Sequence, residues 1–202
     1  ELNPVRNAIL YSDGRAEEQA KQLAETYQGG AERFLNTVGN RLEGCLPLPK
    51  LMWLREHESE TYARIRHVLI SSKDYLIAQL TGECVGDVAA CSTAGAMNIR
   101  NGQWDAELCE AAGIDMTMLP HLHNPQDNIG AVTESAAQRT GFFAGTAVYA
   151  GIGDAGATTL ASGVSHPCQY NINIGTSGWI ATVSPEPFTD KPGAANLAFG
   201  VE

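Results

Sequence analysis

Two patterns of hydrophobic and polar positions alternate along the chain. Short continuous apolar runs bounded by turn residues predict buried strands, and stretches in which apolar residues recur every three or four positions predict helices. The predicted strands cover residues 7–11, 68–70, 129–132 and 146–152. The predicted helices cover residues 15–27, 72–80, 104–112 and 133–140, whereas residues 83–103 have no clear period and predict a loop or short strands.

Capping residues and prolines locate several helix boundaries. Ser71 or Ser72 caps the helix that follows the strand at 68–70. Pro49 suits a first helical turn, and the apolar residues 51–54 after it predict a helix that is buried nearly all round. Ser59 then caps a second, shorter helix.

The most informative stretch runs from Tyr149 to Val183. An apolar strand ends in glycines around Asp154, and a helix of small residues follows. A second apolar strand, 170–174, runs into Gly175-Thr176-Ser177-Gly178 and is followed by another apolar run. This order predicts a strand, a helix and then a hairpin whose turn carries two glycines.

Strands and helices alternate along the whole chain. Such alternation favours an α/β domain with a mixed or parallel sheet covered by helices. The last 20 residues contain Pro185, Pro187 and Pro192, which predict an irregular crossover. We therefore expect a second domain to begin near Ser165.

Composition and charge narrow the class of protein. With 202 residues, 44% hydrophobic and 18% charged, the chain has an ordinary globular composition. Its net charge of −10 argues against nucleic acid or an anionic membrane surface as partner. No apolar run approaches a transmembrane length, and the first residues lack a signal-peptide core. The odd number of cysteines, five, favours buried thiols in a reducing cytoplasm.

Asp154 has two interpretations when the residues are considered alone. A Gly-Asp pair before a helix is a common N-cap, and this interpretation is favoured locally. The alternative is a general base at the end of a strand, where the small neighbours Gly153, Ala155 and Gly156 let a ligand approach. A carboxylate in that position can take the proton of a sugar hydroxyl during phosphoryl transfer.

The turn from Gly175 to Gly178 also has two interpretations. Glycine and serine are frequent in ordinary hairpin turns, but two glycines also let backbone amides form an anion-binding concavity to which Thr176 and Ser177 add hydroxyl donors. The turn is neither a Walker loop nor a nucleophile elbow, because G-x-x-x-x-G-K-[ST] and G-x-S-x-G are both absent there.

Other polar residues have ordinary structural interpretations when taken alone. Asp13 is expected to cap a helix and Arg15 to be a solvated first-turn residue. Lys50 and Lys73 lie near helix starts, where lysines are usually at the surface. The two histidines at 121 and 123 lack a neighbouring acid or cysteine at ligand spacing, so a loop is expected there and a metal site is not.

Several ordered segments together resemble the FGGY family of carbohydrate kinases, and within it most closely the xylulokinases. The segment GIGDAGA is followed by the segment NIGTSG, and Gly175 lies 21 residues after Asp154. ILYSDGRAEEQ, KLMWLREHE and SSKDYLIAQLTGE precede them in the family's order. The resemblance implies an actin/Hsp70/hexokinase-like (ribonuclease H-like) ATPase fold. Residues 1–164 would be the later part of the sugar-binding domain, and 165–202 the beginning of the nucleotide-binding domain.

The resemblance also implies roles for individual residues. Asp154 matches the family's catalytic base, and Asp13 matches an acidic position near the sugar. The turn Gly175, Thr176, Ser177 and Gly178 matches a motif that contacts ATP phosphates. Ala155 occupies a sugar-contacting position where xylulokinases usually have Asn and glycerol kinases Gln, so the sugar is left open. Lys50 and Trp53 belong to a signature interpreted as structural.

The function implied is an ATP- and Mg²⁺-dependent cytoplasmic kinase that phosphorylates a ketopentose, D-xylulose first. Gluconate or another polyol or sugar acid is the alternative acceptor, and a catalytically weak sugar- or nucleotide-binding regulator is a second alternative. The partners implied are a sugar and ATP, with no nucleic acid and no membrane. The oligomeric state stays open, with a homodimer as one alternative. The chain lacks the family's N-terminal Asp-x-Gly-Thr motif and its adenosine-binding segment, so it is expected to be a fragment.

Overall fold

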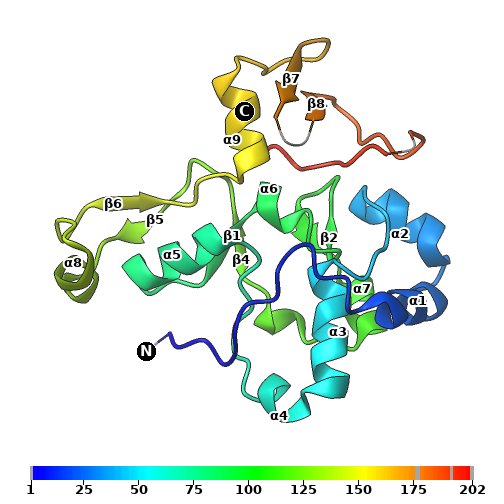
Figure 1. Ribbon diagram of the computed structural model, residues 1–202, viewed down its shortest axis with the longest axis horizontal. Helices are drawn as coiled ribbons and strands as arrows, with labels where there is room; N and C mark the ends of the chain where they lie inside the picture. The colour runs from blue at the N-terminus through cyan, green and yellow to red at the C-terminus, as the bar shows by residue number, and fades with distance from the viewer. Residues whose placement is uncertain (1, 176–177, 192, 201–202) are drawn as a thin grey trace.

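The computed structural model describes residues 2–175, 178–191 and 193–200 (Figure 1). The elements of its first half are α1 (Glu17–Thr26), α2 (Gly30–Val38), α3 (Pro47–His57), α4 (Ser59–Tyr62), α5 (Ser72–Thr81), β1 (Val85–Asp87), α6 (Val88–Cys91) and β2 (Met97–Asn98). The second half contains β3 (Gln103–Trp104), α7 (Ala106–Ala112), the 3₁₀-helix η1 (Met116–Met118), β4 (His121–His123), β5 (Asn128–Ala131), α8 (Glu134–Thr140), β6 (Ala147–Tyr149), α9 (Asp154–Ala161), β7 (Tyr170–Ile174) and β8 (Gly178–Thr182).

Helices and strands alternate along the described chain, which confirms the α/β class. β1 pairs in parallel with β4, with Val85 opposite His121. The other pairs, β2–β3, β5–β6 and β7–β8, are antiparallel. The parallel and antiparallel pairing is mixed as expected, but the described strands form four separate two-stranded sheets and do not join in one sheet.

The apolar runs at residues 7–11 and 68–70 are not strands, contrary to the sequence prediction. Residues 7–11 form irregular chain in which the side chains of Leu10 and Tyr11 are 69% and 90% exposed. In the second run, Val68 N–H donates to the Met118 carbonyl at 2.8 Å without a strand forming. A strand requires repeated pairing with a neighbour, and neither run has a partner strand among the described residues.

The predicted helices are present with small shifts at their ends. Ser71 caps α5 in a capping box with Asp74, and Gly82 ends the helix in a left-handed conformation with φ +89°. Thr133 caps α8 as expected. The short helix α4 begins at Ser59 itself, with Glu58 at the N-cap position and no side-chain cap bond.

Three local predictions need correction. α2, over Gly30–Val38, has no counterpart among the helices predicted from the sequence. α7 begins after Asp105, which caps it, and not at Trp104. Trp104 belongs to β3 and pairs with Met97 of β2. The histidines at 121 and 123 lie in strand β4 and not in a loop.

The main hydrophobic core lies between α1, α2, α3 and α7, at the right and centre of Figure 1. α3 is buried on most sides, as its apolar sequence predicts, and Trp104 docks beside the core by donating from Nε1 to the Pro120 carbonyl at 2.8 Å. Side chains with essentially no exposed surface fill the centre: Leu23, Phe34, Val38, Leu48, Met52 and Leu108.

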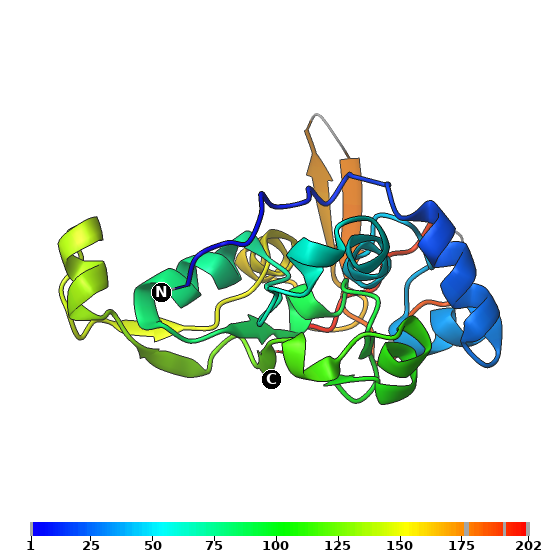
Figure 2. The same ribbon diagram turned by 90° about the horizontal axis from the view of Figure 1, so that it is seen from below.

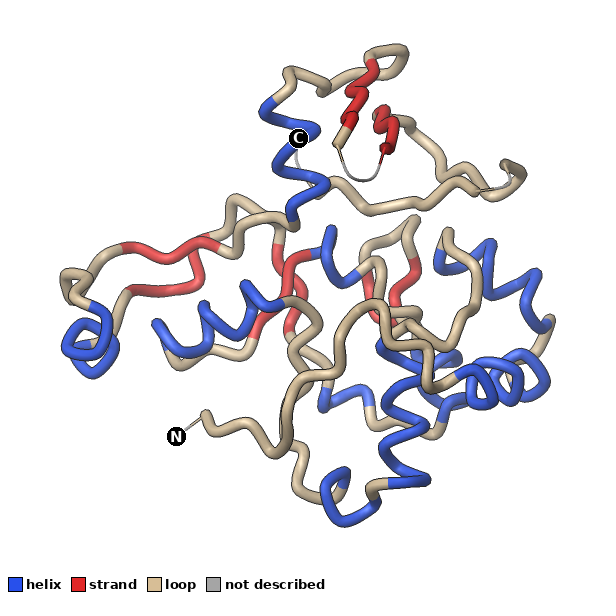
Figure 3. The backbone as a smooth tube through the Cα atoms, viewed as in Figure 1, coloured by secondary structure: helices blue, strands red, loops and turns tan. Residues whose placement is uncertain are grey.

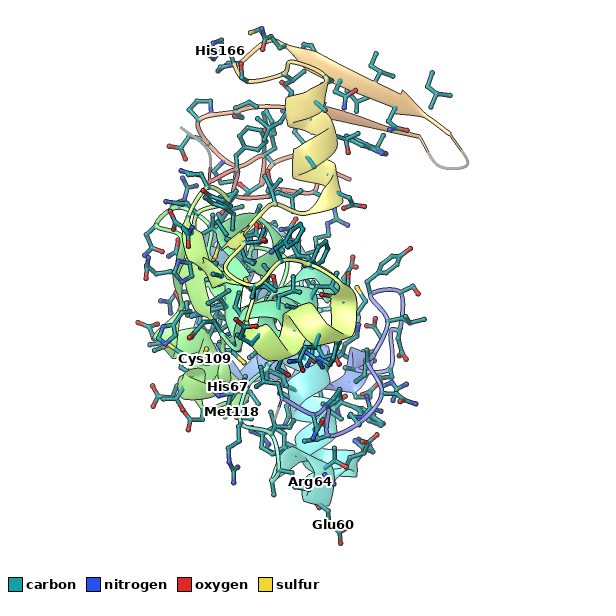
Figure 4. All side chains as sticks on the ribbon, turned by 90° about the vertical axis from the view of Figure 1, so that its left-hand side faces the viewer. Glu60, Arg64, His67, Cys109, Met118 and His166 are labelled. Carbon is teal, nitrogen blue, oxygen red and sulfur yellow. The ribbon has the colours of Figure 1, made fainter. Side chains whose placement is uncertain are left out.

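α9 and the β7–β8 hairpin lie apart from this helical body, at the top of Figure 1, and Figure 2 shows the hairpin projecting from the rest of the chain. Figure 4 places His166, just after α9, at the opposite end of the molecule from Glu60 and Arg64 beside α4. After β8 the chain follows an irregular path back along the body (Figure 3). The prediction that the last residues are irregular is therefore confirmed over the described residues.

A pair of asparagines fixes this returning segment to the body. Asn40 Nδ2 donates to the Asn196 carbonyl at 2.7 Å, and Asn196 N–H donates to Asn40 Oδ1 at 2.8 Å. The Asn196 side chain, 8% exposed, also accepts from Phe188 N–H at 2.8 Å and donates to the Gly39 carbonyl at 2.5 Å. α9 and the hairpin are therefore an excursion whose two ends are both attached to the helical body.

Within the described residues, no helix combines the length and apolarity that are needed to cross a membrane.

Phe34 provides a direct test of where the core lies. Its side chain is fully buried, whereas Phe143 is 86% exposed and serves as a matched control. We expect Phe34→Ala to lower the free energy of unfolding by about 3–5 kcal/mol, because it removes a buried ring and leaves a cavity. Phe143→Ala should change it by less than about 0.5 kcal/mol. Urea unfolding of both variants measures this, and equal effects would contradict the assignment of the core.

Candidate active site

Asp154 lies at the junction between β6 and α9. The connecting loop is fixed to the preceding turn, because Ala150 N–H donates to the Asp127 carbonyl at 3.0 Å and Gly151 N–H donates to the Pro125 carbonyl at 2.9 Å. Gly151 has φ +66°, a left-handed conformation that is strained for a residue with a side chain. The direction in which the chain enters α9 is therefore set by a glycine and two backbone hydrogen bonds.

The carboxylate of Asp154 does not cap the helix. The N-cap position belongs to Gly153, Asp154 is the first helical residue, and α9 has no side-chain cap bond. Asp154 is exposed, and Oδ1 accepts the adjacent Ala155 N–H at 2.9 Å. The locally favoured interpretation of this aspartate as a helix cap is thus wrong, and its carboxylate remains accessible to a ligand.

Two further residues of α9, Gly156 and Thr159, are buried. A side-chain carbon on the buried Gly156 would overlap the Ile152 side chain, so only glycine fits there. Buried Thr159 donates from Oγ1 to the Ala155 carbonyl at 2.7 Å. Ala155 itself is half-buried and presents only a methyl group, so its side chain offers no hydrogen bond to a ligand.

The hairpin that carries the second candidate motif lies beside α9 (Figure 1). Its register places Ile174 opposite Gly178, and Asn171 Nδ2 donates to the Thr158 carbonyl of α9 at 3.5 Å. The pairing of β7 with β8 confirms the predicted hairpin, and Gly175 and Gly178 are exposed at its end. Thr176 and Ser177 lie outside the described residues.

Asp13 is neither a helix cap nor a free acid. Its Oδ1 accepts from Arg15 Nε at 3.0 Å and its Oδ2 accepts from Arg15 Nη2 at 2.6 Å. The N-cap of α1 is Ala16, without a side-chain cap bond. The side-chain and backbone hydrogen bonds from Arg15 lower the pKa of Asp13 from 3.8 to about 2. Asp13 is therefore a permanently ionised partner of Arg15 at neutral pH.

Arg15 and Lys50 attach this segment to α3. The Arg15 guanidinium lies 4.7 Å from the ring centroid of Trp53, so it is held by an ion pair and a cation–π contact and is not simply solvated. Lys50 is 6% exposed and donates from Nζ to the Leu10 carbonyl at 2.8 Å, and its burial lowers its pKa. The expected surface position of Lys50 is wrong, because this residue belongs to the buried part of α3.

The candidate residues fall into two groups. Asp154, Ala155 and the turn at 175–178 belong to α9 and the hairpin, whereas Asp13 belongs to the segment that crosses the helical body. No hydrogen bond or ion pair between described residues joins Asp13 to Asp154. The contact between Arg15 and Trp53 is not anticipated from the sequence. The two residues are 38 positions apart, and a helical pattern within each segment does not indicate which segments pack together.

The part of the chain that the structure describes contains no group of three or more His, Cys, Asp or Glu side chains that could hold a metal ion.

The low pKa of Asp13 is directly testable. Because the folded-state pKa lies below the ordinary 3.8, the pairing contributes stability above that pH and loses it as the pH falls through about 2. We expect Arg15→Met to return the pKa of Asp13 to near 3.8. Carboxyl NMR titration measures both values, with Asp115, whose pKa is lowered by Thr117 instead, as the internal control. An Asp13 pKa that is the same with and without Arg15 would contradict this origin.

Comparison with known proteins places these elements in a family. The sequence model of the N-terminal domain of the FGGY family of carbohydrate kinases matches residues 1–161. The chain is 36% identical over 186 residues to a probable L-xylulose kinase of Pasteurella multocida, and the match covers 91% of this chain and 38% of that protein. The chain spans about two-fifths of the length of the first curated relatives that it matches.

Solved structures agree with the sequence matches. A xylulose kinase from Rhodospirillum rubrum superposes with a TM-score of 0.80 at 33% identity, covering 87% of this chain and 36% of that one. A gluconate kinase from Lactobacillus acidophilus superposes with a TM-score of 0.78 at 25% identity, covering 88% and 35%. These neighbours confirm the expected actin/hexokinase-like α/β fold. On the sequence match and these folds, the chain belongs to the FGGY family of carbohydrate kinases.

Proposed function

We propose that the protein to which this chain belongs transfers the γ-phosphoryl group of MgATP to a hydroxyl of a ketopentose, with D-xylulose as the first candidate. The observation that carries this proposal is the carboxylate of Asp154. It is exposed at the first residue of α9, it makes no cap bond, and it follows a glycine-rich loop that a ligand can approach.

Asp154 serves in this reaction as the general base. A sugar hydroxyl is a very weak acid, so its attack on phosphorus is helped by a carboxylate that accepts its proton as the new bond forms. Such a base contributes roughly 10²–10⁴ in rate, and positioning and electrostatics supply most of the rest in phosphoryl transfer. The hydrogen bond from Ala155 N–H to Oδ1, at 2.9 Å, holds the carboxylate in one orientation.

The turn from Gly175 to Gly178 contacts the phosphates of MgATP. Among the residues that the structure describes, the nearest heavy atom that a methyl group built on Gly178 would meet is the Asn173 carbonyl oxygen, at 3.8 Å, which leaves room for a ligand beside this backbone. Thr176 and Ser177 add hydroxyl donors in this proposal. Magnesium enters as part of the nucleotide substrate, held mainly by phosphate oxygens and water.

Residues 165–202 form the beginning of a second, nucleotide-binding domain in this proposal, and residues 1–164 belong to the sugar-binding domain. The family match ends at residue 161, where α9 also ends. The hairpin exposes a set of large apolar side chains, Tyr170, Ile172, Ile174 and Ile180, all at least 63% exposed. An apolar patch of this kind is typical of a surface that another part of a protein covers.

The proposed phosphoryl acceptor is a ketopentose, with gluconate as the second candidate. Ala155 cannot hydrogen-bond to a sugar through its side chain, so the choice between a ketopentose and gluconate depends on other residues. The relatives named as xylulose kinases favour the ketopentose, and the gluconate kinase neighbour keeps a sugar acid as the second candidate. A non-catalytic sugar-binding role has less support, because the aspartate at the base position is present and exposed.

Replacing the base in the full-length protein tests the mechanism. We expect Asp154→Asn to lower kcat by at least about 10²-fold, because the amide cannot accept the hydroxyl proton. The affinity for the sugar, measured by calorimetry, should change by less than about threefold because the amide preserves the shape of the side chain. Asp115→Asn, at another exposed aspartate, is the matched control and should leave both quantities near wild type. Unchanged turnover in Asp154→Asn would refute the base role.

A panel of acceptors tests the substrate class. We expect the full-length protein with MgATP to release ADP fastest with D-xylulose, followed by other ketopentoses, with much lower kcat/KM for gluconate and glycerol. Coupled measurement of ADP release with each acceptor, including L-xylulose, gives the ranking. A higher kcat/KM for gluconate than for every ketopentose would contradict the proposed acceptor and favour a sugar acid. The absence of any sugar-dependent ADP release would favour the non-catalytic binding role.

A further inference from the structure

A buried cluster of three charged side chains, Lys73, Asp74 and Asp87, lies outside the candidate active site. The Lys73 ammonium is 2.6 Å from Asp74 Oδ1 and 2.7 Å from Asp87 Oδ2. Both aspartate side chains are completely buried, and the Lys73 side chain is 22% exposed, so its expected surface position is wrong. One ammonium therefore compensates two carboxylates that water does not reach.

Each carboxylate of this cluster is also a structural hydrogen-bond acceptor at a helix start. Asp74 Oδ2 accepts from Ser71 N–H at 3.0 Å and closes the capping box of α5. Asp87 Oδ1 accepts from the N–H groups of Ala89 and Ala90, at 2.9 and 3.0 Å, and caps α6. Lys73 thus links the start of α5 to the end of β1 and the start of α6.

Packing around the cluster leaves little freedom. A methyl group built on Gly86 would overlap Cys91 Sγ and lie 3.6 Å from Asp74 Oδ2. Burial raises the pKa of Asp74, against the opposing effect of Lys73. For Lys73, burial alone would lower the pKa, but the interactions with both carboxylates outweigh it and raise the pKa.

The stem of Lys73 lies next to the loop that leads to Asp154. A methyl group built on Gly151 would come within 3.9 Å of Lys73 Cδ, so the Lys73 stem borders the space beside this glycine. Gly151 lies three residues before Asp154 and has a left-handed backbone conformation. Its N–H donates to the Pro125 carbonyl. α5, which carries Lys73, also packs along β5 and β6, the pair from which this loop emerges (Figure 1).

We propose that Lys73 is a positioning residue for Asp154, because its ion pairs with Asp74 and Asp87 hold its stem against the Gly151 loop. The ion pairs fix the stem, the stem fixes the path of residues 150–153, and that path sets the direction of the first turn of α9. This inference rests on the proposed role of Asp154 as the base. It goes further by assigning the orientation of Asp154 to a charge cluster that does not contact the substrate.

The test uses the full-length protein with the double variant Lys73→Met/Asp74→Asn. It removes the ammonium and one carboxylate together, so the net charge of the cluster is unchanged and the capping acceptor at position 74 is retained. Lys73→Gln/Asp74→Asn, which adds amide donors toward Asp87, is the second variant if the first does not fold. Lys21→Met, at an exposed lysine paired with Glu18, is the matched control. Lys73→Arg tests rescue, because it keeps the charge and reach.

We expect the double variant to lower kcat roughly 10- to 100-fold, the effect of a small displacement of a catalytic group. The KM for sugar should stay within about threefold, since the affected interaction belongs to the transition state. Amide hydrogen exchange at Ala150 and Gly151 should accelerate in the folded double variant and remain at the wild-type rate in Lys21→Met. Lys73→Arg should restore kcat to within about threefold of wild type.

The outcomes separate this inference from the proposed function. If Asp154→Asn is inactive while the folded double variant keeps wild-type kcat and wild-type exchange at Gly151, the positioning role is overturned. Loss of kcat with no faster exchange in the loop also overturns it, because the loop is then not the connection. If Asp154→Asn itself keeps full turnover, the base role fails first, and faster exchange in the double variant then reports only a structural link.

Discussion

The compensation of two buried carboxylates by one ammonium is the constraint on which the centre of this structure depends. Burying an unpaired carboxylate costs several kcal/mol, so Asp74 and Asp87 can be buried only with Lys73 and the helix amides as partners. Satisfying both carboxylates fixes α5, β1 and α6 relative to one another. Because β1 pairs with β4, and α5 packs against β5 and β6, the same requirement extends to the loop that carries Asp154.

The residues that hold the fold together and the residue proposed to act in the reaction lie in different parts of the structure. The core of α1, α2, α3 and α7 and the charge cluster form a body in which Asp13 is paired with Arg15 and Lys50 donates to the Leu10 carbonyl. Asp154 instead stands exposed at the start of an excursion of α9 and a hairpin. The excursion returns to the body at Asn196, so both of its ends are fixed to the same support.

Features that depend on nearby residues were predictable from the sequence. The capping box of α5, the cap of α8 and the buried face of α3 follow from residues within a few positions of one another. The pairing of β7 with β8 in the last hairpin is equally local. The α/β class follows from the alternation of such segments, and the family follows from the order and spacing of its motifs.

Features that depend on distant partners were not predictable in the same way. The apolar runs at 7–11 and 68–70 have strand-like sequences, but a strand also needs a neighbour that no local pattern specifies. Lys73 resembles a surface lysine until Asp87, 14 residues away, is placed beside it. Asp154 resembles a helix cap because the sequence does not reveal that Gly153 takes the cap position. In each case the missing information is a tertiary contact or a backbone angle.

The central claim is that Asp154 is placed to accept a proton from the phosphoryl acceptor, and a crystal structure of the full-length protein with D-xylulose and a non-hydrolysable ATP analogue tests it most directly. We predict an Asp154 carboxylate oxygen within about 2.6–3.2 Å of the hydroxyl that faces the γ-phosphate, directly or through one water. A complex in which another carboxylate occupies that position, and Asp154 reaches no sugar hydroxyl, would contradict the claim.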